Sequence, residues 1–407
     1  MKTRYVLGFL IIFFFSGFLQ KSQERPLVSV IDEALEFSLK QSLILAEMYE
    51  DQEGVLPKSY IEGKNITSGP EWWCSGFFPG VLWYLYEDSK NNQVRSYAEA
   101  YTARVEEEKY TTDNHDVGFM LYCSFGNGLR LTGRKDYKDV LVTGAKSLST
   151  RFNPKVGLIR SWDFNKENWQ YPVIIDNMMN LELLLRASSF TGDKKFKNMA
   201  ISHADKTLEN HYRDDFSSFH VVSYDTLNGK PHKKQTHQGY NDSSSWSRGQ
   251  AWGLYGYTVM YRETGKKRYL DQAKKIARYL LDHPNMPLDF IPYWDLDDPD
   301  IPSAPRDAST AALMASAFVE LSQYVSKTES EEYLKVVEKQ IRILASPKYT
   351  ASLGENGGFI LKHSVGSLPH NSEVDVPLTY ADYYYMEALI RYKKLLKEGK
   401  LYLTSKR

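Results

Sequence analysis

A helical pattern that occurs three times with the same ending constrains the fold of this chain more than any other feature. Residues 117–137, 177–196 and 250–269 each begin with a helical run of small and apolar residues that stops at a Thr-Gly pair. A basic turn and an aromatic residue then open a second helix in each segment. Glycine directly after a helix is a frequent C-terminal stop, because it adopts the left-handed backbone conformation without steric cost. Three copies of this layout predict a chain built from repeated helical hairpins.

A looser form of the same pattern completes six hairpins. Further inner runs occur at residues 76–86, 309–324 and 380–396. The partner helices of the six inner runs are expected at residues 30–49, 94–107, 137–149, 195–211, 269–283 and 331–345. Both members of a pair show apolar residues at spacings of three and four, and the partners carry more charge on one face. This alternation predicts an all-α fold, a closed (α/α)6 six-hairpin barrel that takes residues 23–407 as a single domain. Strand-like pieces are expected only near residues 219–224 and 358–362.

The first residues have the layout of an export signal. Lys2 and Arg4 precede an apolar run over residues 6–19, and a polar stretch follows. A run of this length is short for a membrane span and typical of a secretory signal. We therefore expect residues 1–22 to be a signal peptide, and the mature protein to be exported, most simply to the periplasm, without stable membrane insertion. An uncleaved anchor is the alternative, because no clear small-residue cleavage site follows the run.

The composition argues against several classes of protein. The 51 Lys and Arg residues balance 51 Asp and Glu residues, which disfavours a protein that binds nucleic acid through a basic face. Cys74 and Cys123 lie beside bulky apolar residues, so two buried free thiols are expected rather than a disulfide. No CxxC or HExxH spacing indicates a metal site, and no cofactor is expected. The aromatic residues, 29 Tyr, 19 Phe and 8 Trp, are expected mainly in the core, with some free to stack on sugar rings.

Residues able to do chemistry gather directly before the inner helices. They are Trp72-Trp73, His115-Asp116, Asp176-Asn177, Trp246-Ser247-Arg248, Arg306-Asp307, and Asp375 with Tyr380. If the inner helices run in the same direction, these groups share one rim, where the helix N-termini favour an anion. The aspartates also have a structural alternative as helix N-caps, and Arg248 as the partner of a helix end. Asp176 stands among apolar residues, which raises the pKa of a carboxyl toward that of a usable general acid. Two carboxylates with aromatic platforms suit glycosidic-bond chemistry.

The stretches at residues 115–119, 175–181, 237–239, 244–253, 306–309 and 373–384 together resemble glycoside hydrolase family 88, the unsaturated glucuronyl hydrolases. The most specific are Asp-Asn-Met-Met-Asn-Leu at 176–181 and Trp-Ser-Arg-Gly-Gln-Ala-Trp-Gly at 246–253. The similarity extends from about Trp72 to the last helix. It implies a six-hairpin barrel that removes the 4,5-unsaturated glucuronyl residue from the non-reducing end of lyase-generated oligosaccharides. The implied route is hydration of the C4=C5 vinyl ether, not direct displacement.

The resemblance also implies a role for each residue of the site. Asp176 is implied to be the acid/base and Asp116 the second carboxylate. Implied substrate contacts are Trp73, His115, Asn177, His220, His237, Gln238, Trp246, Arg248 and Trp252. Trp72 competes with Trp73 for its position, and the role of Trp162 stays open. Possible contacts to sulfate or to the second sugar are Lys362, Ser364 and Ser367, since Lys and Ser are suitable sulfate partners.

Two other functions stay open at this point. One is the unsaturated rhamnogalacturonyl hydrolase chemistry of family 105 on the same barrel, against which the Trp246–Gly253 stretch and the His237-Gln238 pair argue. The other is a catalytically silent carbohydrate-binding protein of the same fold, against which the presence of both Asp116 and Asp176 argues. The parent polysaccharide (chondroitin, hyaluronan, heparin or ulvan), the sulfation preference and the oligomeric state do not follow from the sequence.

Overall fold

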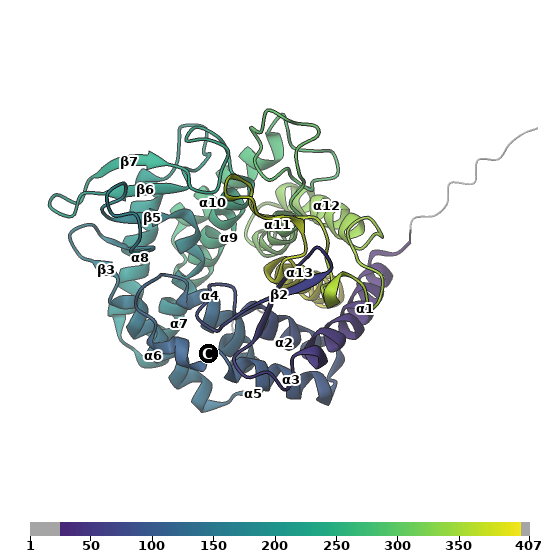
Figure 1. Cartoon of the computed structure of the whole chain (residues 1–407). Helices are drawn as coiled ribbons and strands as arrows, with labels where there is room; N and C mark the ends of the chain where they lie inside the picture. The colour runs from purple at the N-terminus through teal and green to yellow at the C-terminus, as the bar shows by residue number, and fades with distance from the viewer. Residues whose placement is uncertain (1–24, 400–407) are drawn as a thin grey trace, which may run out of the picture.

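The computed structural model describes residues 25–399, which form a closed barrel of two concentric rings of helices (Figure 1). Each ring contains six helical segments. The inner helices are α2 (Phe77–Ser89), α4 (Val117–Leu121) with α5 (Asn127–Thr132), α7 (Leu181–Thr191), α9 (Ser247–Thr264), α11 (Ala308–Leu321) and α13 (Thr379–Glu398). The outer helices are α1 (Leu27–Met48), α3 (Asn92–Ala103), α6 (Lys135–Ser149), α8 (Lys194–Asn210), α10 (Lys267–Asp282) and α12 (Lys327–Leu344). The predicted (α/α)6 barrel is therefore confirmed.

The ring closes because the last inner helix meets the first. Helix α13 packs against α11 on one side and against α2 on the other. Each outer helix covers an inner neighbour, as α10 covers α9 and α12 covers α11, while α1 lies over the junction of α2 and α13. The second inner run is the one irregular member, because a π-helical turn (Tyr122–Gly126) joins α4 to α5.

The two rings differ in burial as their sequences predict. Helix α11 buries every one of its residues, whereas α10 buries one stripe at spacings of three and four, Tyr269, Ala273, Ile276, Ala277 and Leu280 among them. The Thr-Gly stops are confirmed as well. Gly133, Gly192 and Gly265 follow α5, α7 and α9 with φ of 69°, 76° and 67°, the left-handed conformation that ends a helix.

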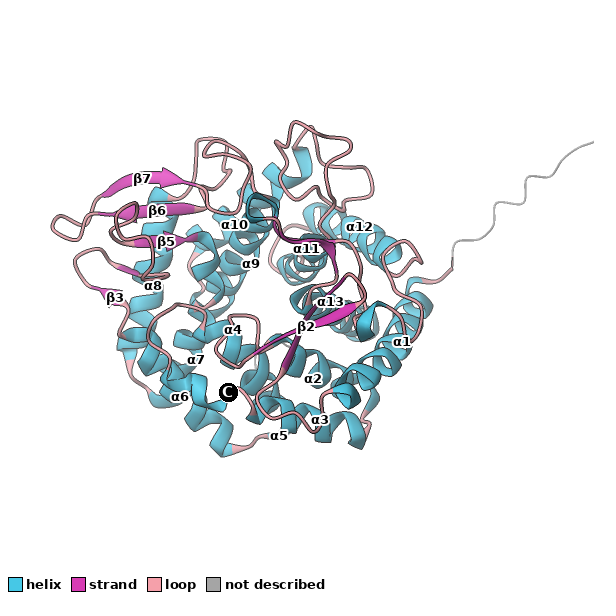
Figure 2. Cartoon of the chain, viewed as in Figure 1, coloured by secondary structure: helices cyan, strands magenta, loops and turns pink. Residues whose placement is uncertain are grey.

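Within residues 25–399, nine short strands lie in the loops and form four antiparallel sheets (Figure 2). They are β1 (Leu56–Ile61) with β2 (Lys64–Ser68), β3 (Phe152–Asn153) with β4 (Leu158–Ile159), β5 (Pro172–Ile174) with β6 (Val221–Tyr224) and β7 (Pro231–Gln235), and β8 (Ser364–Ser367) with β9 (Ser372–Val376). Strand β6 confirms the piece expected near residues 219–224. The strand expected at residues 358–362 is wrong, because only Leu361 forms an isolated bridge there and β8 begins at Ser364. Strands of two to six residues are too short to show a reliable alternating pattern.

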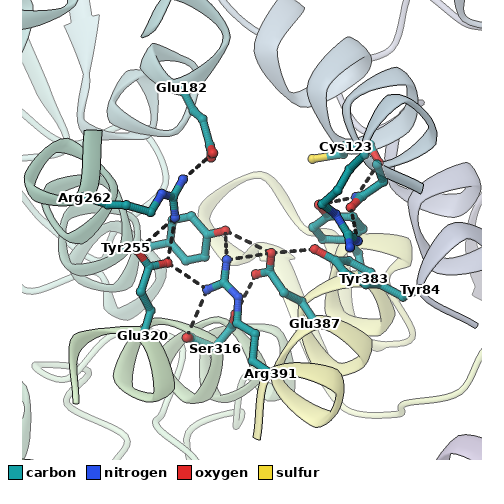
Figure 3. Close-up of polar contacts among 12 residues, drawn as sticks. Tyr84, Cys123, Glu182, Tyr255, Arg262, Ser316, Glu320, Tyr383, Glu387 and Arg391 are labelled. Atoms are coloured by element: carbon teal, nitrogen blue, oxygen red, sulfur yellow. Dashed lines mark hydrogen bonds and ion pairs between the residues drawn. The ribbon is translucent and has the colours of Figure 1, made fainter. Parts of the chain in front are cut away.

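Deep in the barrel, polar side chains from several inner helices converge on Glu387 of α13 (Figure 3). Its carboxylate accepts hydrogen bonds from Tyr84 of α2 at 2.7 Å, Tyr255 of α9 at 3.1 Å and Ser316 of α11 at 2.6 Å. Arg391 lies one turn further along α13 and donates to the same carboxylate at 2.9 Å. The contact from Tyr84 to Glu387 joins the first inner helix to the last, so this cluster ties the ring closed.

A second arginine extends this network. Arg262 of α9 pairs with Glu320 at 2.8 Å and with Glu182, and Glu320 also meets Arg391 at 3.3 Å. Glu182, Arg262, Glu387 and Arg391 line a cavity of about 100 Å³. Each of the charges named has a partner of opposite sign, which offsets the cost of burying it.

Other expectations fall as follows. Cys74 and Cys123 are buried free thiols, as predicted. The expected signal peptide, residues 1–22, lies outside the described residues. Among residues 25–399 no helix is long and apolar enough to cross a membrane.

Candidate active site

Asp176 and His220 are brought together by a strand pairing. Asp176 lies in a 3-10 turn (Ile175–Met179) that follows β5, and His220 directly precedes β6. The two strands pair in register, and the Ile175 amide donates to the His220 carbonyl at 3.1 Å. As a result, Nε2 of His220 lies 3.6 Å from Oδ2 of Asp176.

Asp176 is the buried carboxyl of the site. It is 9% exposed, makes no helix-capping bond, and its Oδ2 has no hydrogen-bond partner among the described residues. Burial raises the pKa of Asp176 from 3.8 to about 7, because the charged form loses hydration. His115 and Arg248 oppose this rise, and the negative charge of Asp116 adds to it. A carboxyl with such a pKa is partly protonated near neutral pH and suits general acid chemistry.

His220 is held in one tautomer. Its Nδ1 accepts hydrogen bonds from the backbone amides of His237 at 3.0 Å and Gln238 at 3.1 Å. Burial lowers the His220 pKa well below its ordinary value, so the ring is neutral. A neutral ring that accepts at Nδ1 carries its proton on Nε2, which faces Asp176.

Asp116 lies at the start of α4 and forms no side-chain cap. Its Oδ1 is 3.1 Å from Nε2 of the buried His115, and its side chain is 18% exposed. The start of α4 packs closely on the end of the Asp176 turn, where Asn180 accepts a hydrogen bond from the Phe119 amide at 2.8 Å. A Cβ at Gly118 would lie only 2.5 Å from Oδ1 of Asn180, so this approach requires glycine. The packing places the second carboxylate within electrostatic reach of Asp176.

Arg248, at the start of α9, is 2% exposed and is committed to protein partners. Its guanidinium donates to the carbonyls of Val365 and Gly366 in β8, and pairs with Asp307 at 3.1 Å. Asp307 in turn caps α11 by accepting from the Ser309 amide at 3.0 Å. Asp307 is therefore a helix cap, and Arg248 is the partner of that helix end. These are the structural roles that the sequence offered as alternatives to substrate contact. Arg248 also acts on Asp176 through its charge.

The tryptophans occupy different depths. Trp72 is 42% exposed beneath Lys58, whereas Trp73 packs at 4.9 Å from Tyr380 and 5.5 Å from Phe119, so Trp73 is the member of the pair that faces the barrel. Trp246 lies 4.6 Å from the ring of His220.

Trp252 and Asn177 are among the implied substrate contacts that lie beneath the surface of the site. Trp252 is 1% exposed and packs between Phe119 and Tyr384. Asn177 is fully buried and donates to the Ile159 carbonyl at 2.9 Å. Neither side chain offers an exposed surface, so in this structure both support the floor of the site.

An aromatic rim borders His237, and sequence reasoning largely missed it. Trp162 stacks on the half-exposed Phe164 at 4.8 Å, and Trp162 and Trp169 lie 5.6 Å and 5.5 Å from His237. The ring of His370 also lies 4.5 Å from the ring of His237. Burial lowers the pKa of His237 to about 4. The long loop at residues 151–176 was the available signal, since two tryptophans and two phenylalanines fall inside it.

The three residues considered for sulfate do not form one cluster. Lys362 donates to the Pro347 carbonyl at 2.8 Å, and Ser364 is fully buried. Ser367 bonds to Nδ1 of His370 at 2.7 Å, which places it beside the His237 rim. Of the three, Ser367 is the one whose hydrogen-bond partner, His370, packs against His237.

Comparison with known proteins agrees with this geometry. The family model described as Glycosyl Hydrolase Family 88 matches residues 56–396. An unsaturated glucuronyl hydrolase of Formosa agariphila is 47% identical over 325 residues, 80% of each chain. The crystal structure of an unsaturated glucuronyl hydrolase specific for heparin superposes with a TM-score of 0.88 at 46% identity, over 91% of this chain and 98% of the other. A mutant unsaturated glucuronyl hydrolase of Streptococcus agalactiae complexed with dGlcA-GalNAc6S gives a TM-score of 0.78 at 29% identity, over 92% and 94% of the two chains. A match of this extent, on a barrel with two carboxyls at its rim, assigns the chain to glycoside hydrolase family 88.

Proposed function

We propose that this glycoside hydrolase removes the 4,5-unsaturated glucuronyl residue from the non-reducing end of lyase-generated oligosaccharides. The observation that carries the proposal is the state of Asp176, a buried carboxyl with a pKa of about 7 beside a second carboxylate. Relatives over most of the chain are named for this activity, which supports the choice of substrate.

The chemistry of an unsaturated uronate matches one carboxyl that is protonated near neutral pH. The C4=C5 bond is a vinyl ether, so a proton from Asp176 adds to C4 and positive charge develops at C5 and the ring oxygen. Water then adds at C5 and gives a proton to the Asp176 carboxylate. The hemiketal opens to a ketone at C5, and the hemiacetal left at C1 expels the remaining sugar as an alcohol.

The surrounding residues have distinct parts in this proposal. The negative charge of Asp116 supports the protonated form of Asp176 and the positive charge that develops on the sugar ring. The Nε2 atom of His220 lies 3.6 Å from Oδ2 of Asp176, near enough for its proton to stabilise the carboxylate left after the first proton transfer. Trp73 borders the sugar, and the buried Trp246 supports the site from behind the ring of His220. Arg248 is buried and paired with Asp307, and it acts on Asp176 through its charge.

The substrate panel that tests the proposal contains disaccharides released by lyases from heparin, chondroitin, hyaluronan, ulvan and pectin. Hydration removes the conjugated double bond, so loss of its ultraviolet absorbance reports turnover. We expect turnover of at least one glucuronyl substrate and none of a reduced analogue that lacks the C4=C5 bond. Cleavage of the reduced analogue would instead indicate ordinary displacement.

Two results would support the alternatives. Turnover confined to the pectin product would favour the rhamnogalacturonyl chemistry of family 105. Binding of every glucuronyl disaccharide without loss of absorbance would favour a silent carbohydrate-binding protein.

Export to the periplasm is part of the proposal and rests on residues 1–22 alone. Expression of the full chain with fractionation of the cells, followed by determination of the mature N-terminus, tests it. A chain that stays in the cytoplasm with Met1 intact would refute it.

A further inference from the structure

Asp307 accepts more hydrogen bonds than a helix cap needs. It is 1% exposed, and its two oxygens accept from the amide and hydroxyl of Ser309 and from the hydroxyl of Thr310. They also accept from the guanidinium of Arg248 at 3.1 Å and from the amide of Val365 at 3.3 Å. One carboxylate thus joins three elements, α9, α11 and β8.

Arg248 depends on this carboxylate for its position and for its charge balance. The guanidinium lies 4.8 Å from the ring of Trp246 and 5.3 Å from the ring of Tyr380, and it donates to two successive carbonyls of β8. Carbonyls and rings do not neutralise a buried cation fully. Asp307 is the carboxylate that forms an ion pair with it among the described residues.

The charge of Arg248 matters because Asp176 is the other carboxyl within its electrostatic reach. The groups that face Asp176 are His115 and Asp116 at the start of α4, His220 before β6, and Arg248 on α9. Of these groups, only Arg248 carries a permanent positive charge. If it were unpaired, it would draw Asp176 into the carboxylate form, which cannot donate a proton to C4.

We propose that Asp307 is a positioning residue for the reaction: it fixes the Arg248 guanidinium against β8 and neutralises it beside Asp176. This inference rests on the proposed function, because it assigns Asp307 a part in keeping the proposed acid protonated. Asp307 also helps to position β8, because it accepts from the Val365 amide. The position of β8 in turn affects Gln238, which donates to the Gly366 carbonyl at 3.3 Å.

The test compares two buried aspartates that anchor the same segment. Asp307→Asn removes the charge and keeps the size, and Asp307→Glu keeps the charge. The matched control is Asp382→Asn, since Asp382 is 4% exposed and accepts from the amides of Ile360 and Leu361, both at 2.8 Å. Asp382 has no arginine partner among residues 25–399. A merely structural role predicts that Asp307→Asn and Asp382→Asn behave alike.

The readout is the pH at which kcat/KM declines on the basic side. We expect Asp307→Asn to move this decline to lower pH by about 1 pH unit, the size of effect that one nearby charge has on a carboxyl. Asp307→Glu and Asp382→Asn should leave the decline at the pH found for the unaltered chain, whatever they do to the maximum rate. An unmoved decline in Asp307→Asn, or an equal movement in Asp382→Asn, overturns the inference.

A measurement without turnover separates this inference from the proposed function. Infrared difference spectra between the chain and its Asp176→Asn variant follow the protonated Asp176 carboxyl directly. The titration should shift down in Asp307→Asn, and should return toward its original pH in the double variant Asp307→Asn with Arg248→Met, where the unpaired cation is gone. If the unaltered chain shows no turnover while these shifts occur, the proposed function fails and the electrostatic role of Asp307 stands. If the double variant titrates like the single one, the role through Arg248 is wrong.

Discussion

Replacing Asp176 by asparagine should abolish turnover and, at alkaline pH, stabilise the fold. Asparagine resembles the neutral carboxylic acid in size but never acquires the charge that burial penalises. The Asp176 pKa is about 7 in the folded protein and ordinarily 3.8. At about 1.4 kcal/mol per pH unit, this difference corresponds to about 4 kcal/mol of folded-state stability.

The sign depends on pH in a definite way. Below pH 3.8 both the folded and the unfolded carboxyl are protonated, so the stability contributed by the folded-state proton is fully present. As the pH rises toward about 7, the unfolded chain ionises while the folded one stays protonated, and the unaltered protein loses stability relative to the variant. Above about pH 7 the unaltered protein has lost all of this stability, and the difference in the free energy of unfolding between it and the variant no longer changes with pH. The same titration makes kcat/KM of the unaltered enzyme fall above about pH 7, since the proposed acid must carry its proton.

Urea unfolding of both proteins at pH 4, 6 and 8.5, followed by tryptophan fluorescence, measures this prediction. The expected gain of the variant is small at pH 4 and about 4 kcal/mol at pH 8.5. The control is Asp113→Asn, which replaces an exposed carboxyl before α4 and should change stability by less than about 1 kcal/mol. A gain from Asp176→Asn that is independent of pH, or a variant less stable than the unaltered chain at pH 8.5, would falsify the reasoning.

Three further predictions follow from the geometry. Glu387→Ala leaves four hydrogen-bond donors, the buried Arg391 among them, without this acceptor, so urea unfolding should show a loss of about 3–5 kcal/mol. Glu331→Ala, which breaks an exposed pair at 3.8 Å, should change stability by less than about 1 kcal/mol. Gly118→Ala places a Cβ only 2.5 Å from Oδ1 of Asn180, which should push the Asp116 and Asp176 carboxyls apart and lower kcat at least about tenfold. An unchanged kcat would show that this close approach is not needed. Trp73→Ala should raise KM for the disaccharide at least about tenfold, while the exposed Trp72→Ala should not, and equal effects would contradict the assignment of Trp73 to the site.

Much of the fold was accessible from the sequence because the signals that specify it are local. A helix is marked by spacings of three and four residues, and its end by a glycine that tolerates a left-handed backbone, as at Gly133, Gly192 and Gly265. Six repetitions of one hairpin leave few closed arrangements other than a barrel. The common direction of the inner helices then places their leading residues at one rim, so the sequence alone groups Asp116, Asp176 and Arg248.

The identity of hydrogen-bond partners was decided by tertiary structure, because the partners are distant in the chain. Arg248 contacts Val365 and Gly366 more than a hundred residues away, and no local pattern distinguishes this from a contact to substrate. The tautomer of His220 is likewise set by amides that only strand pairing and the following loop bring to its Nδ1.

The burial of individual tryptophan side chains was likewise decided by tertiary structure. Trp72 and Trp73 are adjacent and identical in type, yet one lies outside and the other faces the barrel. Trp252 has a sequence context that suits a sugar platform, but packing against Phe119 and Tyr384 leaves it no exposed face. Periodicity along one helix fixes which side faces inward, whereas the depth of a side chain depends on the neighbours that other helices supply.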